Sequence, residues 1–204
     1  LDYIGVKQFV EKGLEFSTGG TPLEKYLSIV SYISDINKKC KDLVNELINK
    51  GKTVCSFQTR NIPHLGHERI IEEGLKHCDY LVVNPLIGVR KKGDFKTEII
   101  EKAFQFLIEN FYGNKVLYAP IIANMFYAGP REAFHHSIIR QNIGFTHFIV
   151  GRDHAGAEGI YEEDAAFKNL KGNKLNIEVI PIEGAYYCTE KKSAVIKGVD
   201  NYDK

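Results

Sequence analysis

The chain has 204 residues, with 27 lysines and arginines against 26 aspartates and glutamates, so its formal net charge is +1. This length fits one sizeable domain with a small appendage. The balanced charge excludes the broad basic field that attracts nucleic acid or an anionic membrane surface, so we expect neither partner and expect any anion site to be local. No apolar run approaches the roughly 20 residues that a membrane span needs, and no secretory signal opens the sequence, which favours a cytoplasmic protein.

The four cysteines are Cys40, Cys55, Cys78 and Cys188, and no two of them form a CxxC pair. They lie in stretches with the apolar pattern of helices or strands. We therefore expect buried, reduced thiols rather than disulfides.

The first expected element is a helix from Pro22 to Lys50, either one long helix or a broken pair, which Gly51 ends. From there on, short apolar strands alternate with amphipathic helices. The strands are expected at 52–57, 80–88, 115–121, 146–151 and 176–181, and the helices at 67–77, 94–112, 130–142 and 162–170. This alternation predicts an α/β fold with a parallel sheet and helices on both of its faces.

Unusual polar loops follow four of the expected strands. They read QTRNIPHLGH, NPLIGVRKKGD, NMFYAGPRE and GRDHAG in chain order. In an open parallel sheet the ligand crevice lies beyond the carboxyl ends of the strands. All four loops are therefore predicted to lie at the same edge, around one site.

The first loop contains an HxGH sequence, with His64 and His67 three residues apart and Gly66 between them. The spacing places both imidazoles near one side of a first helical turn. Glycine lets the backbone N–H groups and the positive helix end approach an anion, so the pair suits the grip of phosphate oxygens. One histidine capping the helix while the other packs in the core is an equally good interpretation.

Gln58 and Arg60 end the first strand. Gln58 could be an edge position bonded to backbone, and Arg60 a surface residue. A planar guanidinium, however, matches a tetrahedral oxyanion with two parallel hydrogen bonds, and an amide beside it adds a donor. The other anion-directed loops favour this second interpretation.

The second loop presents Arg90, Lys91 and Lys92 before Gly93, with Asp94 expected as the N-cap of the next helix. Phosphate contact by one of the lysines and simple solvation of the charge run are equally compatible with the sequence.

The third loop turns at a glycine, after which Pro130 is expected at the first helical position. Arg131 and Glu132 fit a local ion pair. His135 and His136 are expected as helix-face residues rather than ligands.

The fourth loop follows a solidly apolar strand that ends at Gly151, and presents Arg152, Asp153 and His154 before the small Ala155. Arg152 can bind an anion, and the backbone N–H of Ala155 can join it because no bulky side chain intervenes. The alternative is an ordinary polar loop, but such loops rarely need this much glycine and alanine.

Together these motifs resemble the catalytic domain of the ATP sulfurylase (sulfate adenylyltransferase) family. The resemblance rests on FQTRNIPHLGHE, NPLIG followed by RKKGDF, and YAGPREAFHHSIIRQNIGFTHFIVGRDHAG; it is strong over residues 54–156 and fades towards the C-terminus. It implies a Rossmann-like nucleotidyltransferase domain over residues 52–204, preceded by a helical segment over residues 1–51. The implied reaction, reversible, is ATP plus sulfate giving adenosine 5′-phosphosulfate plus pyrophosphate, as used in sulfate assimilation and sulfur metabolism.

The resemblance also implies roles for individual residues. It assigns sulfate binding to Gln58, Arg60 and Ala155, catalysis to Thr59, Arg60, Asn61, His64 and His67, and ATP binding to Gln58, Asn61, His64, His67, Gly151, Arg152, Asp153 and His154. Mg²⁺ is expected to arrive with ATP, and homo-oligomers occur in the family, so the helix from Pro22 to Lys50 could be an interface or could cover the sheet.

The sequence departs from the family pattern at several places. Phe126 stands where members usually have arginine, Pro63 lies one residue later than in many members, and the family's amino-terminal domain is not recognised. Only Cys188 remains where some bacterial members carry a cysteine cluster, so no zinc is predicted, and the tail lacks a closing helix. These departures keep two alternatives open: a non-catalytic nucleotide-binding module descended from the enzyme, and another HxGH nucleotidyltransferase.

Overall fold

The computed structural model describes residues 22–87, 95–152, 154, 161–162 and 164–200. A five-stranded, entirely parallel sheet lies at its centre, in the order β4-β2-β1-β6-β7. The strands are β1 (Val54–Phe57), β2 (Tyr80–Val83), β4 (Val116–Tyr118), β6 (His147–Gly151) and β7 (Glu178–Ile182). The chain builds outward from β1 to β4, then crosses back to β6 on the other side of β1, which makes the boundary between β1 and β6 the topological switch point.

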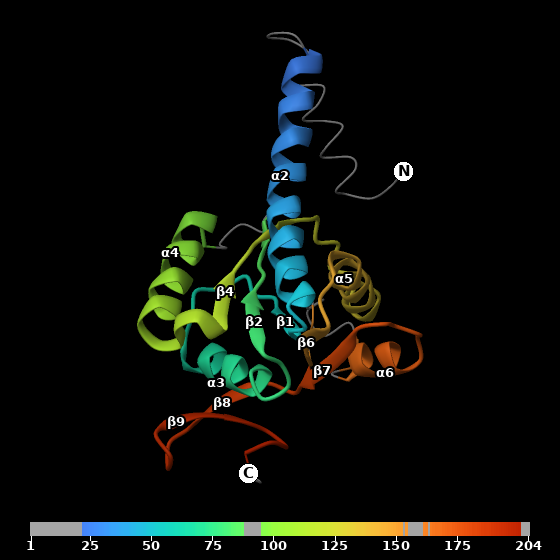
Figure 1. Ribbon diagram of the computed structural model, residues 1–204. Helices are drawn as coiled ribbons and strands as arrows, with labels where there is room; N and C mark the ends of the chain where they lie inside the picture. The colour runs from blue at the N-terminus through green and yellow to red at the C-terminus, as the bar shows by residue number, and fades with distance from the viewer. Residues whose placement is uncertain (1–21, 88–94, 153, 155–160, 163, 201–204) are drawn as a thin grey trace.

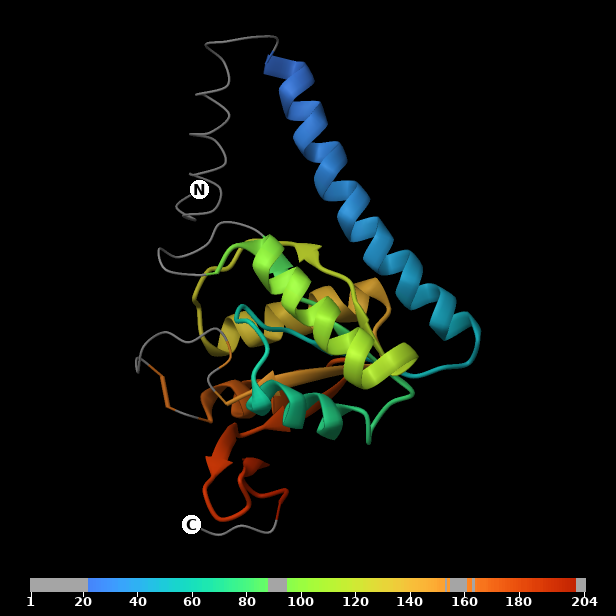
Figure 2. The ribbon, with the colours of Figure 1, turned by 90° about the vertical axis from the view of Figure 1, so that its left-hand side faces the viewer.

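Helices cover both faces of this sheet, as the sequence predicts (Figures 1 and 2). One face is covered by α2 (Pro22–Asn49), α5 (Pro130–Ile143) and α6 (Ala165–Lys171), and the other by α3 (Leu65–Gly74) and α4 (Thr97–Leu107). Successive strand residues point to opposite faces, so Val54 and Phe148 enter the first core while Cys55 and Ile149 enter the second.

The long helix α2 is continuous, and its second half covers the sheet. Cys40, Val44 and Leu47 are buried there. The Asn37 side chain donates to the carbonyl of Ile122 at 3.1 Å and accepts from its N–H at 2.7 Å. The first half of α2 extends beyond the sheet (Figure 1).

Two expected strands end earlier than the sequence predicts. Asn84-Pro85 separates β2 from β3 (Leu86–Ile87), and Ala119-Pro120 separates β4 from β5 (Ile121–Ile122); β3 and β5 pair as a second parallel sheet. Proline has no N–H to donate to the ladder, so each strand of the main sheet stops there.

The helix expected at 94–112 also differs. It begins at Thr97 with Lys96 at its N-cap, so the prediction of an Asp94 cap was wrong. After Leu107 the helix widens into a π turn at Ile108–Tyr112 and a 3₁₀ turn at Gly113–Lys115. Asp94, Arg90, Lys91 and Lys92 themselves lie outside the described residues.

The chain also forms an antiparallel hairpin from β8 (Ala185–Cys188) and β9 (Ser193–Ile196), which was not expected from the sequence. The hairpin packs on α3, and Ile196 joins Ile71 in the core. Asp200 links the hairpin to α3. Its carboxylate accepts hydrogen bonds from Arg69 Nε at 2.9 Å, from Arg69 Nη2 at 2.6 Å and from the Ile196 N–H at 2.6 Å. The hairpin thus closes the side of the domain where no helix was expected.

All four cysteines are free thiols, as predicted, and three are buried, whereas Cys78 is half-buried.

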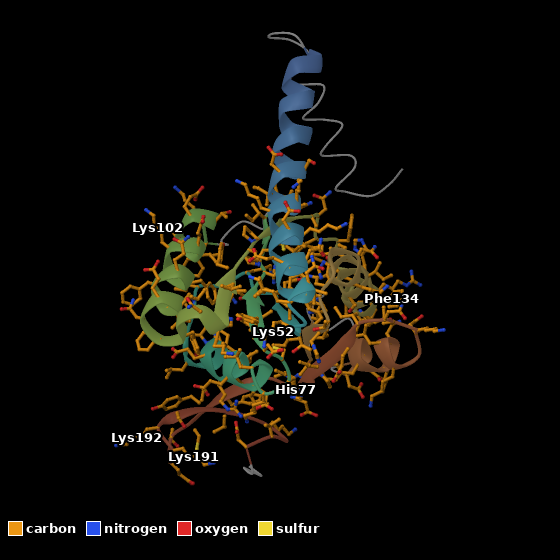
Figure 3. The ribbon with its side chains drawn as sticks, viewed as in Figure 1. Lys52, His77, Lys102, Phe134, Lys191 and Lys192 are labelled. Carbon is orange, nitrogen blue, oxygen red and sulfur yellow. The ribbon has the colours of Figure 1, made fainter. Side chains whose placement is uncertain are left out.

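Lys102 on α4 and Lys191 and Lys192 at the hairpin turn point away from the core (Figure 3). Of the helices described, none has the length and apolar character to cross a bilayer.

Candidate active site

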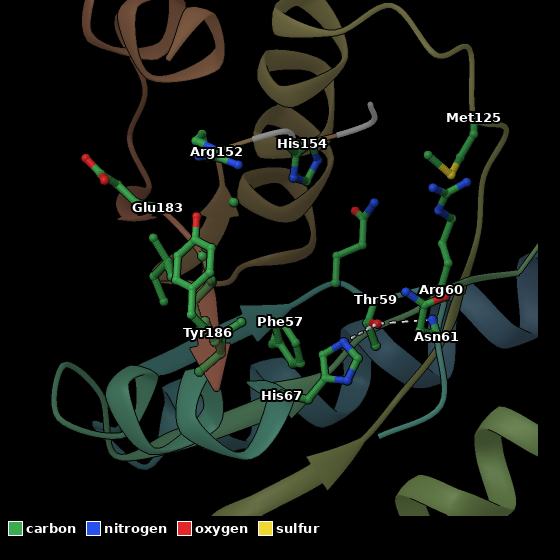
Figure 4. A pocket seen from close by; sticks show the side chains of 17 residues that line it. Phe57, Thr59, Arg60, Asn61, His67, Met125, Arg152, His154, Glu183 and Tyr186 are labelled. Carbon is green, nitrogen blue, oxygen red and sulfur yellow. Dashed lines mark hydrogen bonds between the residues drawn. The ribbon is translucent and has the colours of Figure 1, made fainter. Parts of the chain in front are cut away.

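A pocket of about 660 Å³ opens at the carboxyl edge of the sheet, beyond β1, β6 and β7 (Figure 4). Its lining includes eight of the residues singled out in the sequence: Gln58, Thr59, Arg60, Asn61, His67, Gly151, Arg152 and His154. Met125 of the third loop also lines the pocket, so the expectation that separate polar loops meet at one edge is confirmed for the first, third and fourth loops.

The loop after β1 is shaped by its own hydrogen bonds. Thr59 is buried, and its Oγ1 accepts from the N–H of Asn61 at 3.2 Å and lies 3.1 Å from His67 Nε2. Gln58 Oε1 is buried and has no hydrogen-bond partner among the residues that the structure describes. A buried amide oxygen without a partner is costly, so this position is suited to a group that a ligand would supply.

Arg60 reaches across to the third loop. Its Nη1 donates to the hydroxyl of Tyr127 at 3.1 Å, and its guanidinium carbon lies 5.5 Å from the centre of that ring. Tyr127 itself has a φ of 54°, an unusual backbone conformation for a residue with a side chain. The guanidinium is thus held at the pocket wall by a strained loop.

The two histidines of the HxGH sequence stack at the start of α3, with ring centres 3.9 Å apart. His64 is the N-cap, and its Nδ1 accepts from the N–H of Gly66 at 3.1 Å; a Cβ at Gly66 would lie 2.9 Å from His64 Cε1. His67 is buried and lines the pocket, whereas His64 is exposed beside it. Burial, and then the neighbouring His64, lower the pKa of His67 from 6.5 to about 4, so His67 is uncharged at neutral pH.

The fourth loop leaves β6 at the opposite wall. The N–H of Arg152 donates to the carbonyl of Ile182 on β7 at 3.0 Å, which fixes the strand end. His154 Nε2 lies 2.8 Å from His136 Nδ1. Burial, followed by His136, holds the pKa of His154 well below its usual range. Asp153 and Ala155 lie outside the described residues.

The third loop contributes in an unexpected way. Pro130 takes the first helical position of α5, as predicted. Glu132 was expected in a local ion pair with Arg131; instead it is buried, and its carboxylate accepts from the N–H groups of Phe126 at 2.8 Å and Ala128 at 2.9 Å.

The two neighbouring histidines of α5 behave differently. His135 is exposed, as expected of a helix-face residue, whereas His136 is fully buried and faces His154. Phe126 is 38% exposed and packs beside His135, with ring centres 5.9 Å apart, and it is Met125 from this loop that lines the pocket.

Sequence reasoning also missed the wall that the C-terminal part provides, where Ile182, Glu183, Gly184, Ala185 and Tyr186 line the pocket. A signal was available, because the loop after the fifth expected strand must reach the same edge of a parallel sheet.

A buried arginine supports the site from behind. Arg140 on α5 donates from Nε to Asn84 Oδ1 at 3.0 Å and from Nη2 to the Asn84 carbonyl at 3.3 Å. Burial lowers its pKa to about 9. The Ser56 hydroxyl donates to the same Oδ1 at 3.3 Å, so Asn84 ties the ends of β1 and β2 to α5.

The lining that the structure describes is rich in groups that attract anions. Arg60 and Arg152 carry positive charge, Gln58 and Asn61 carry amides, and Glu183 is the one carboxylate among the described lining residues. Within the described ranges, no group of three or more histidine, cysteine, aspartate or glutamate side chains is placed to hold a metal ion. The pocket is therefore suited to anionic ligands.

Comparison with known proteins agrees with this chemistry. The ATP-sulfurylase family model matches residues 36–203. The sulfate adenylyltransferase of Ignicoccus hospitalis is 50% identical over 141 residues, which is 67% of this chain and 36% of that protein. The one from Aeropyrum pernix is 47% identical over 141 residues, with the same two shares, and the one from Pyrococcus abyssi is 45% identical over 157 residues, or 75% of this chain and 41% of that protein.

This chain thus spans 36–41% of the length of these curated relatives. Among solved structures, a hexameric APS kinase from Thiobacillus denitrificans superposes with a TM-score of 0.55 at 16% identity, over 78% of this chain and 30% of that one, a likeness that concerns the fold alone. The family match extends over far more than half of the sequence, and the chain therefore belongs to the ATP-sulfurylase family.

Proposed function

We propose that the chain carries the adenylyl-transfer site of a sulfate adenylyltransferase, which converts ATP and sulfate to adenosine 5′-phosphosulfate and pyrophosphate and runs in both directions. The observation that carries the proposal is the meeting of Gln58 and Arg60, His67 and Arg152 around one pocket of about 660 Å³. That volume lies within the range of small-molecule sites. Family membership supports the choice of substrates.

Sulfate is proposed to bind at the end of β1. Arg60 would give two parallel hydrogen bonds to sulfate oxygens, and the Gln58 amide would turn its NH₂ group towards the anion. The resemblance adds the backbone N–H of Ala155. Gln58 Oε1, which has no partner within the described part of the chain, supports a ligand-dependent role for this side chain.

The triphosphate is proposed to lie over the start of α3. The positive end of that helix and the two stacked histidines, His64 and His67, would face the position of developing negative charge. Asn61 and Thr59 complete this wall. Gly151, Arg152, Asp153 and His154 are proposed to contact the nucleotide and its α-phosphate from the opposite side.

The proposed reaction needs no covalent enzyme intermediate. A sulfate oxygen attacks the α-phosphorus in line with the departing pyrophosphate, so the protein mainly positions two anions and neutralises charge. His67 is uncharged at neutral pH and hydrogen-bonds Thr59. An incoming phosphate would favour its protonated form, which would then donate to the leaving group.

Magnesium is proposed to arrive on the triphosphate as part of the substrate, where it would neutralise charge on the leaving pyrophosphate. The donor set fits this arrangement, because the described lining offers cationic and amide groups and the single carboxylate of Glu183. No zinc is proposed.

The remaining proposals concern organisation. We keep the boundary between a helical segment at 1–51 and a catalytic domain at 52–204, and a homo-oligomer as the assembly, with the first half of α2 as a candidate interface. A cytoplasmic location, with a role in sulfate assimilation, is proposed on the four free thiols and the family.

The proposal is tested by ATP formation from adenosine 5′-phosphosulfate and pyrophosphate with Mg²⁺. We expect turnover that falls by ~100-fold or more in Arg60→Ala, because one charge-directed contact is lost, with ATP affinity retained. Arg131→Ala, a change at an exposed arginine, is the matched control and should leave turnover unchanged.

Two outcomes would overturn the proposal. ATP binding without any turnover would favour a non-catalytic nucleotide-binding module. Turnover with a phosphorylated acceptor but not with sulfate or selenate would favour another HxGH nucleotidyltransferase.

A further inference from the structure

Glu132 is a fully buried carboxylate. Among the described residues it does not line the pocket, and the one basic side chain it contacts is a histidine, His136. Burying a carboxylate is costly unless hydrogen bonds satisfy it. Burial alone would raise the pKa of Glu132, but contacts with His136 and with two backbone N–H groups outweigh it and hold the pKa below its ordinary value. The carboxylate is therefore ionised at neutral pH, and its contacts show what it holds.

The first set of contacts leads to Arg60. Oε1 accepts from the N–H of Phe126 and Oε2 from the N–H of Ala128, so the two oxygens grip both sides of Tyr127. Tyr127 has the left-handed φ of 54°, which costs free energy unless the surroundings hold it. The Tyr127 hydroxyl accepts a hydrogen bond from Arg60 Nη1. By holding the backbone around Tyr127, Glu132 therefore sets the position of the Arg60 guanidinium.

The second set leads to His154. Glu132 Oε1 lies 3.3 Å from His136 Nε2, in a contact that lacks the alignment of a good hydrogen bond, and His136 Nδ1 lies 2.8 Å from His154 Nε2. His136 is fully buried, and burial, opposed by Glu132 but aided by Arg140, lowers its pKa, so it is neutral.

These contacts favour one set of proton positions. A neutral His136 beside a carboxylate carries its proton on Nε2, so its Nδ1 must accept. His154 then donates from Nε2, and its own Nδ1 is left as an acceptor. His154 would thus accept a hydrogen bond from a ligand hydroxyl or amine rather than donate one to a phosphate oxygen.

We propose that Glu132 is a positioning residue for both walls of the pocket, holding Arg60 through Tyr127 and holding His154 through His136 with its proton on Nε2. This inference rests on the proposed function for its kinetic consequences, but its structural content does not. If Glu132 only stabilised the start of α5, its loss would not change the position of Arg60. Nor would its loss change which nitrogen of the His154 ring carries the proton.

The proton positions are tested first, on the unmodified chain, by ¹⁵N resonances of the histidine rings at neutral pH. The inference predicts that His154 is protonated on Nε2 and bare on Nδ1. A His154 with its proton on Nδ1, or with both nitrogens protonated, would overturn it. This measurement needs no sulfate chemistry, so its outcome is separate from that of the proposed function.

Variants then separate the path through Tyr127 to Arg60 from the path through His136 to His154. Tyr127→Phe should raise KM for sulfate by ~10-fold with little change in the nucleotide KM, because a small displacement of a positioned group costs one or two orders of magnitude. His136→Leu should lower kcat by ~10-fold and free the His154 proton to exchange between its nitrogens, whereas His136→Asn, which can keep an acceptor near the Nδ1 position, should restore most of the loss. Glu132→Gln should show both defects, because an amide can accept from only one of the two backbone N–H groups.

The matched control is His135→Leu, the same change at the exposed neighbour, which should leave all readouts unchanged. Combining Glu132→Gln with His136→Leu should cost less than the sum of the two single changes, since both act on one path. Additive losses, or an unchanged sulfate KM in Glu132→Gln with normal thermal unfolding, would overturn the inference. Should a variant fail to fold, the ring resonances of the unmodified chain still decide.

Discussion

Lowering the pH from neutral should destabilise the folded chain through His67. Its folded pKa is about 4, against 6.5 for an ordinary histidine, because the ring is buried next to His64. As the pH falls below 6.5 the unfolded chain takes up a proton at this residue, while the folded chain does not until the pH nears 4. The stability that neutral His67 maintains above 6.5 is therefore lost as the pH falls towards 4.

The magnitude follows from the two pKa values. Between about pH 7.5 and about pH 5, the unfolded histidine becomes almost fully protonated and the folded one stays almost fully neutral, which amounts to about 2 kcal/mol. This is a large share of the ~5–15 kcal/mol by which a typical domain is stable.

The assay is urea unfolding of the unmodified chain and of His67→Gln at both pH values. His67→Gln also removes the Thr59 contact, but glutamine does not titrate, so only the difference in pH dependence reports on the pKa. The unmodified chain should lose about 2 kcal/mol more than the variant on acidification.

Equal losses in the unmodified chain and His67→Gln would show that His67 is not held neutral and would refute the reasoning. The same pKa argument predicts that pyrophosphate, on binding, reverses the shift. Calorimetric titration near pH 6 should then detect proton uptake in the unmodified chain and less of it in His67→Gln.

Three further predictions concern the pocket wall and the thiols. Asp200→Asn should lower the free energy of unfolding by about 1–3 kcal/mol, because the paired hydrogen bonds to Arg69 lose their charge; urea unfolding measures it, and no change would mean that the hairpin is held by packing alone. Gly66→Ala should weaken ATP binding by ~10-fold although alanine favours helices, since a Cβ there would lie 2.9 Å from His64 Cε1; undiminished affinity in a calorimetric titration would show that this ring is free to move. Thiol titration of the native chain should modify Cys78 first and the three buried cysteines only on unfolding, and rapid reaction of all four would contradict the core described above.

The alternation of elements was predictable because each strand is short and apolar and each helix has an apolar face. Where the prediction erred, a single residue overrode the pattern. Pro85 and Pro120 stop two strands that read as continuous apolar runs, since neither can donate to the ladder.

The hairpin at β8 and β9 lay beyond the prediction for a different reason. Its residues show no α/β alternation, and its place depends on the contact between Asp200 and Arg69, which are 131 residues apart. Such a long-range ion pair leaves no periodic mark in the sequence.

The position of a residue at the pocket was predictable where it directly follows a strand, as with Gln58, Arg60 and Arg152, whereas the roles of these residues stay predictions. Glu132 and His136 were misjudged because a helix-start sequence gives no information on which side chain turns inward. Only the packing of α5 against β6 decides that the neighbouring His135 is exposed while His136 is buried.

Isotope exchange between labelled pyrophosphate and ATP with Mg²⁺ shows whether one pocket brings sulfate and the α-phosphate of ATP together. We expect exchange that requires sulfate and disappears in Arg60→Ala, because pyrophosphate would return to ATP only through bound adenosine 5′-phosphosulfate. Exchange that proceeds equally without sulfate, or no exchange by a chain that binds ATP, would contradict it.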